Sequence, residues 1–145
     1  MDRGLAVVLT AAAGGLIAAQ APINAGLGKA TGSLPAALVS FSIGTMALAA
    51  VVVLSGKAGG LDSAFDVNWY YLLGGLLGAV YVLNALVAVT AIGAGGVAAA
   101  TIFGQLTTAL VIDRLGLFGL DQTPLTGSRV LGVVLLLAGT VLVVR

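Results

Sequence analysis

The sequence predicts an all-α integral membrane protein, and three features lead to that fold class. Of the 145 residues, 60% are hydrophobic and only 8% are charged, and the mean hydropathy is +1.19. Soluble domains carry about 25% charged residues, so this chain could not cover a water-facing surface. Its apolar residues form continuous runs such as AALVSFSIGTMALAAVVVL. Runs without alternation favour helices over a β-barrel in lipid.

Five segments are long enough to span a bilayer, since a hydrocarbon core of about 30 Å needs about 20 apolar residues. The connectors between them are short, so residues 1–145 are expected to form a single transmembrane domain. We expect Thr31 or Ser33 to cap the second helix. The N-terminal apolar run is too long for a signal peptide and is interpreted as the first helix. The predicted spans are about 4–28, 34–55, 68–90, 96–115 and 128–144.

Three missing residue types exclude most chemistry. The chain contains no cysteine, histidine or glutamate. Disulfides, thiolate nucleophiles, Cys- or His-based metal sites and Ser–His catalysis are therefore excluded. The cationic side chains are scattered singly, which argues against a nucleic-acid surface. We expect a protein that is not an enzyme and binds no metal or cofactor.

The charges determine the orientation only weakly. Cytoplasmic loops favour Lys and Arg, and five spans put the two termini on opposite sides. An N-terminus inside gives four cations inside against two outside, so we predict N-in and C-out. A bias this small is also what a protein inserting in both orientations would show, and both readings stay open. The inside residues would be Arg3, Lys57, Arg114 and Arg129, and the outside residues Lys29 and Arg145.

Polar side chains lie on four of the five predicted spans. Gln20 and Asn24 share one face of the first span because they are four residues apart. They should face each other or a wet cavity rather than lipid. One reading is interhelical hydrogen bonding, worth about 0.6 kcal/mol per bond. The other is a substrate cavity, which amides on three helices favour. The candidate substrate-binding residues are Gln20, Asn24, Ser40, Tyr81, Asn84, Gln105 and Thr108.

Pro22 and Asp113 each have two readings. Pro22 removes a backbone donor and frees the carbonyl of Ala18, which predicts a helix kink that could line a cavity. Alternatively it lies harmlessly in the last turns of the first helix. Asp113 could pair with Arg129 across a loop at the membrane interface. It is also the one acid near enough to the predicted cavity to carry a proton.

Small residues predict close helix packing. Gly74 and Gly78 form a GxxxG pair in the third span, and such pairs let helix backbones approach closely. Gly132 and Gly139 mark a candidate dimer surface on the fifth span, the one without a polar stripe. Trp69 and the two tyrosines after it are interpreted as an interfacial aromatic belt.

Four blocks of sequence resemble the YdcZ-like family, a half-size, five-helix branch of the drug/metabolite transporter superfamily. They are QAPINAGLGKATGSLPAALVSFSIGTMAL, WYYLLGGLLGAVYVL, GQLTTALVIDRLGLFG and GVVLLLAGTVLVV. The resemblance implies an exporter in the bacterial inner (cytoplasmic) membrane, built as one repeat that dimerisation completes. Small multidrug members of the superfamily use a buried glutamate in their first helix. This chain has none there, which weighs against proton-coupled export of cationic drugs.

These observations lead to a functional hypothesis. We expect a small membrane transporter that moves a small polar metabolite by alternating access. It would act as a homodimer, antiparallel, or as a heterodimer with a paralogue, with the site between two inverted repeats. The alternative is a non-transporting membrane scaffold or partner subunit, whose polar stripes bind another membrane protein.

Overall fold

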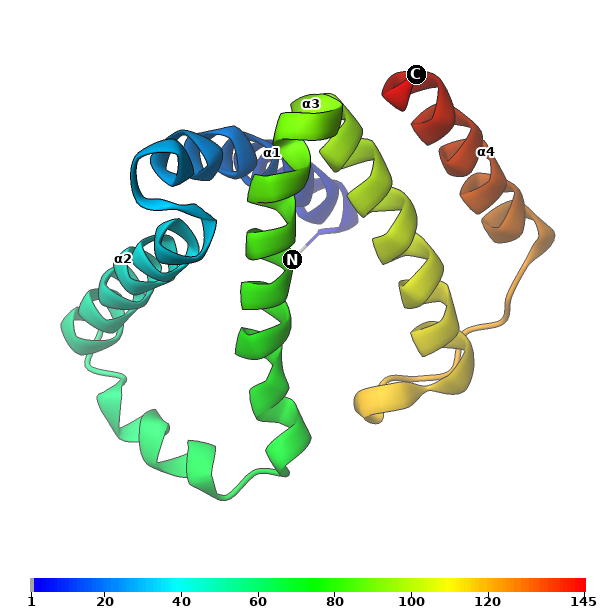
Figure 1. The fold of residues 1–145 in the computed structure, drawn as a ribbon. Helices are drawn as coiled ribbons and strands as arrows, with labels where there is room; N and C mark the ends of the chain where they lie inside the picture. The colour runs from blue at the N-terminus through cyan, green and yellow to red at the C-terminus, as the bar shows by residue number, and fades with distance from the viewer. Residues whose placement is uncertain (1) are drawn as a thin grey trace. The chain divides into compact units, whose positions relative to one another are not determined.

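A computed structural model describes residues 2–145, and this range consists of helices and loops without a strand (Figure 1). Four α-helices carry most of the chain, and short 3-10 helices lie in two of the connections. The elements are α1 (Arg3–Thr31), α2 (Ser33–Leu54), η1 (Ala58–Phe65), η2 (Trp69–Leu72), α3 (Leu73–Leu115), η3 (Leu117–Gly119) and α4 (Gly127–Val144).

The α3 helix contains two of the predicted spans. Its 43 residues would measure about 65 Å as one straight helix, roughly twice the thickness of a hydrocarbon core. Gly93 interrupts it with φ 69° and ψ 169°, a backbone conformation that is essentially restricted to glycine. The helical segments on either side of Gly93 correspond to the predicted spans 68–90 and 96–115.

The predicted fold class is therefore confirmed at the level of a helical membrane protein. Four apolar stretches in the described range are long enough to cross a bilayer, and the longest of them is divided at Gly93. Together they account for the five expected spans. The assembly of a repeat by dimerisation stays a prediction.

The boundary between α1 and α2 differs from the sequence prediction. Residue Gly32 holds the N-cap position of α2 with φ 88°, and no side chain caps this helix. The expected cap by Thr31 or Ser33 is wrong. The Thr31 hydroxyl instead donates to the Leu27 carbonyl, 3.1 Å away in the last turn of α1. A glycine with positive φ reverses the chain in one residue, so α1 extends to Thr31 and the connection shortens to Gly32.

The chain divides into two compact units, of which one is residues 19–90. Its centre consists almost wholly of small residues from α1, α2 and the first part of α3. Gly28 approaches both Ala36 and Leu86, since a Cβ built on it would lie 3.8 Å from each side chain. Most large aliphatic side chains point outward, as expected where lipid covers the surface. The buried apolar residues of this unit are Ala21, Ala25, Ala36, Ala37, Val82, Ala85 and Leu86.

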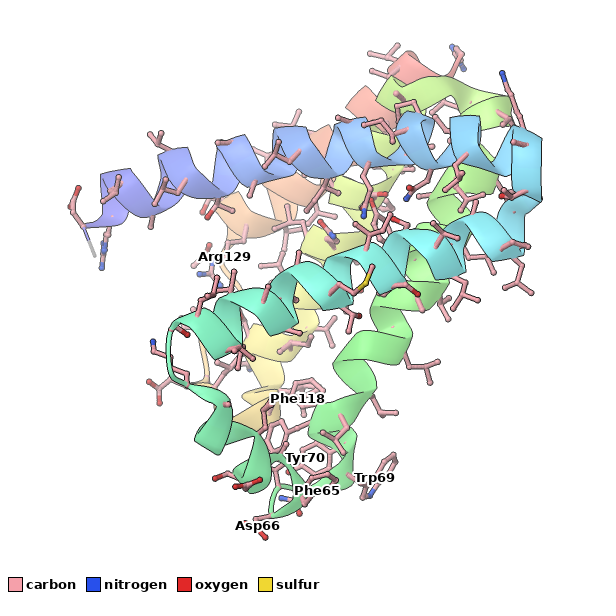
Figure 2. All side chains as sticks on the ribbon, turned by 90° about the vertical axis from the view of Figure 1, so that its left-hand side faces the viewer. Phe65, Asp66, Trp69, Tyr70, Phe118 and Arg129 are labelled. Atoms are coloured by element: carbon pink, nitrogen blue, oxygen red, sulfur yellow. The ribbon has the colours of Figure 1, made fainter. Side chains whose placement is uncertain are left out.

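Aromatic side chains gather where α3 begins. The rings of Trp69 and Tyr70 meet edge to face with centroids 6.4 Å apart, and those of Tyr70 and Tyr71 lie 4.5 Å apart. Figure 2 shows Phe65, Trp69 and Tyr70 close together at the turn that leads into α3. Amphipathic rings prefer the headgroup level of a bilayer. Their position supports the predicted aromatic belt.

The second unit consists of residues 1–18 and 91–145, and in it α4 packs along the latter part of α3 (Figure 1). The Thr140 hydroxyl lies 3.1 Å from the Ala99 carbonyl and 2.8 Å from the Leu136 carbonyl, so it can bond across the two helices. A Cβ built at Gly96 would lie 3.3 Å from Val144. A hydroxyl and a glycine therefore hold this helix pair together.

We predict that Gly93→Ala destabilises the protein, because a Cβ at this φ and ψ costs about 1–3 kcal/mol. The measurement is the unfolding midpoint of the purified chain in detergent. Gly104→Ala is the matched control, since this helical glycine has open space around it and alanine favours the helix. Equal midpoints for the two variants would contradict the assigned backbone break.

Candidate functional site

Asn24 is the one buried polar residue in the described range. Its side chain is 5% exposed, and it lies on α1 between the buried residues Ala21 and Ala25. Its Nδ2 has no hydrogen-bond partner. Leaving a buried donor unsatisfied costs about 1–3 kcal/mol, so such a group calls for a functional explanation. Asn24 is the candidate with the clearest structural signature.

Three further candidates are in the same unit as Asn24. Tyr81 packs against the cluster formed by Ala37, Val82 and Leu86. Gln20 and Ser40 are half-buried, on α1 and α2 respectively. Three helices thus bring polar side chains to this unit. Within residues 2–145, no hydrogen bond joins these groups to one another.

Asn84, Gln105 and Thr108 differ from that group, because all three are exposed in the single chain. Asn84 is on the first part of α3, in the unit that holds Asn24. Gln105 and Thr108 are on the later part of α3, in the other unit. That these three residues line one cavity together with Asn24 stays a prediction.

Pro22 does not break α1. The helix runs from Arg3 to Thr31 with Pro22 inside it. Proline is tolerated within membrane helices when the rest of the hydrogen-bond ladder is kept. Because proline has no N–H, the carbonyl of Ala18 has no helical hydrogen bond from position 22, well inside α1.

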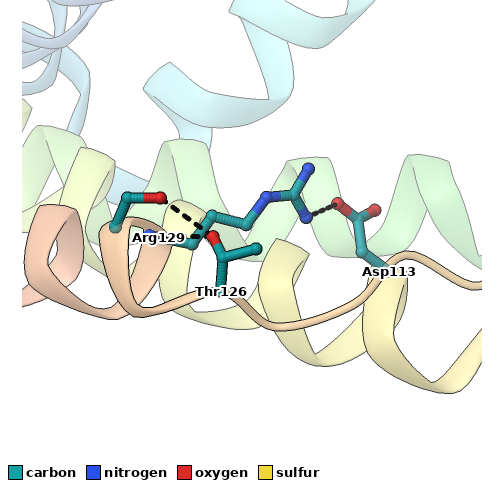
Figure 3. Close-up of polar contacts among 4 residues, drawn as sticks. Asp113, Thr126 and Arg129 are labelled. Atoms are coloured by element: carbon teal, nitrogen blue, oxygen red, sulfur yellow. Dashed lines mark hydrogen bonds and ion pairs between the residues drawn. The ribbon is translucent and has the colours of Figure 1, made fainter.

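Asp113 and Arg129 form the expected ion pair, with 3.4 Å between Oδ2 and Nη1 (Figure 3). Thr126 places Arg129, because its hydroxyl caps α4 by accepting from the Arg129 backbone N–H at 3.4 Å. The loop also returns to the end of α3, where the Thr123 N–H donates to the Asp113 carbonyl at 2.8 Å. Both charged side chains are 38% exposed, so screening limits the pair to about 1 kcal/mol or less.

The packing glycines fall into two groups. Gly78 lies against Phe41, since a Cβ built there would be 3.6 Å from the ring. Gly74, Gly132 and Gly139 have no heavy atom within 4 Å of such a Cβ. These three are open to close approach by another helix, and their role in a dimer stays a prediction.

A pocket of about 310 Å³ lies beside the end of α3, and no sequence pattern indicated it. Its walls are aliphatic residues spread over α3, the following loop and α4. Leu and Val at these positions look like any lipid-facing residues, and only Thr107 and Arg114 interrupt them. The lining residues are Thr107, Leu110, Val111, Arg114, Leu115, Leu125, Val130 and Val133.

A comparison with protein families decides the relationship of the chain. The family described as "Putative inner membrane exporter, YdcZ" matches residues 5–142. The chain belongs to this family. It is thus an integral protein of the inner membrane, from a family of exporters. Neither the curated proteins nor the solved structures contain a significant match to it.

We predict that Asn24→Leu leaves stability unchanged or raises it by about 1 kcal/mol, because it removes an unsatisfied buried donor at similar volume. The check is the unfolding midpoint in detergent. Asn84→Leu is the matched control, since it makes the same change at an exposed site of the same unit. A loss of more than about 2 kcal/mol for Asn24→Leu alone would mean that the amide has a structural partner.

Proposed function

We propose that this member of the YdcZ family exports a small polar metabolite by alternating access, as an antiparallel dimer. The observation that carries the proposal is the buried Asn24 amide, whose Nδ2 has no partner. A buried donor without a partner is one that a bound substrate could satisfy. A substrate carbonyl or carboxylate oxygen would accept from Nδ2 and offset that cost.

The other candidate residues would complete the site with neutral groups. Gln20, Ser40 and Tyr81 are in the unit of Asn24, and each can donate or accept a hydrogen bond. A lining of amides and hydroxyls without a fixed charge suits a neutral or zwitterionic metabolite. Gln105 and Thr108 on the later part of α3 are the remaining polar candidates, and the export assay below tests Gln105.

A second copy would supply the other half of the transporter. Two chains of opposite orientation generate the inverted repeats that place a substrate site near the bilayer midplane. Gly132 and Gly139 on α4 support this arrangement, because the space above both is open within the chain. Gly74 offers the same kind of contact on α3. A heterodimer with an oppositely oriented paralogue would use the same surfaces.

Asp113 is the candidate proton carrier in this scheme. It is partly exposed and paired with Arg129, so its proton would have to exchange as that pair opens. Coupling through this residue would place the proton step at the end of α3 rather than beside Asn24.

We predict that Asn24→Leu and Gln105→Leu abolish export, because the substrate loses hydrogen bonds that the apolar side chain cannot replace. The readout is the metabolite profile of the medium from cells that express the wild type or either variant. Gln122→Leu is the control, since it removes an amide from the loop after α3. Unchanged export in both variants, with the wild type active, would refute the assigned cavity.

We predict that about half of the chains expose their C-terminus outside the cell, as dual topology requires. A single cysteine added after Arg145 reports this when intact cells are treated with a membrane-impermeant thiol reagent. The chain has no native cysteine, so only the added residue reacts. Complete labelling before lysis would contradict the antiparallel homodimer and point to a fixed orientation with a different partner.

One observation favours the alternative, a non-transporting partner subunit. Gln105 and Thr108 lie exposed on one side of α3 and would be covered if another membrane protein packed there. In that case the purified chain would co-purify with one membrane protein, and Gln105→Leu would release it without altering any exported metabolite.

A further inference from the structure

The pocket beside the end of α3 has a shape that limits what can occupy it. Its volume is about 310 Å³, at the small end of the range for ligand sites. That volume accommodates part of a narrow ligand such as a segment of an acyl chain.

The walls of the pocket are apolar along their whole length. Its α3 side runs from Thr107 to Leu115, about 12 Å of helix. The Thr107 hydroxyl is not available to a ligand as a donor, because it donates to the Phe103 carbonyl at 2.8 Å. Val130 and Val133 of α4 face it from the other side. A hydrocarbon chain can bind against such walls without the free-energy cost of burying an unpaired polar group.

Arg114 is the only charged residue that lines the pocket. Its neighbour Asp113 is engaged with Arg129, and Arg114 itself has no hydrogen bond or ion pair to any residue of the range 2–145. A guanidinium remains charged at any accessible pH and binds phosphate oxygens with two parallel bonds. The aliphatic stem of Arg114 thus lines the end of an apolar groove, while its exposed guanidinium has no partner among residues 2–145.

We propose that this groove binds one acyl chain of an anionic phospholipid, whose phosphate pairs with Arg114. Apolar walls and a single cation match the two parts of such a lipid, and basic pockets between membrane helices are typical sites for them. A soluble phosphate would leave the walls empty. The site is separate from the proposed substrate residues, none of which lines it.

The test uses the full chain, purified in detergent and stripped of lipid. Native mass spectrometry then measures retention of dioleoyl phosphatidylglycerol and of dioleoyl phosphatidylcholine. We expect one retained phosphatidylglycerol per chain and a preference for it of about fivefold. Arg114→Gln should abolish the preference, and Arg114→Lys should keep part of it. Arg3→Gln removes the same charge outside the groove and should keep all of it.

A second pair of variants tests the groove itself. Val133→Phe or Val130→Phe would fill it, and retention of both lipids should fall while the far-ultraviolet circular dichroism stays unchanged. A preference that survives Arg114→Gln, or retention that survives both filling variants, overturns the proposal. So does complete displacement of phosphatidylglycerol by an equal concentration of glycerol phosphate, which would indicate a site for free phosphate. Conversion of a dimer to a monomer by Val133→Phe without lipid loss would identify a second copy as the occupant.

Discussion

Helices in lipid gain no hydrophobic free energy from burying aliphatic side chains against one another, because the surrounding hydrocarbon is equally apolar. Close backbone approach and polar contacts must hold them together instead. The unit formed by residues 19–90 follows this constraint, because its buried residues are mainly alanine, with Val82, Leu86 and Asn24 as the larger ones. The pair formed by α4 and the later part of α3 meets the same constraint with Thr140 and Gly96. The placement of the polar side chains depends on these contacts between small residues.

Asn24 lies among these alanines, and its surroundings show whether its amide serves helix packing. An amide among small side chains could have been turned toward a neighbouring carbonyl, as Thr140 is on α4. Instead its Nδ2 is buried and unpaired. The ion pair of Asp113 and Arg129 shows the opposite arrangement, since both of its groups have a partner and are partly exposed, at the helix start that Thr126 caps. The costly polar group of the chain is thus the amide within a span and not the charge at its end.

Much of the fold follows from the sequence, because apolar length and glycine position control it directly. The spans, the pairing of Asp113 with Arg129 and the packing of Gly78 could all be predicted from residue spacing. The end of α1 could not be predicted, because two good capping residues flank Gly32. The glycine takes the N-cap position of α2 instead, with a positive φ. Among the candidate site residues, spacing placed Gln20 and Asn24 on one face but could not distinguish buried Asn24 from exposed Asn84. That difference depends on which helix face meets a neighbour. The pocket beside Arg114 was beyond sequence reasoning, since its walls have the composition of any lipid-facing surface.

The break at Gly93 has a consequence for how the chain enters the membrane. No charged residue occurs between Asp66 and Asp113, so the two spans that meet at this glycine form one long uncharged insert. The turn between them can emerge on either face of the bilayer without carrying a charge across it. During biosynthesis this pair therefore offers no resistance to either orientation, and the choice is left to a few cations near the chain's other turns. A lysine introduced close to Gly93 would end this neutrality and favour the orientation that keeps the turn in the cytoplasm.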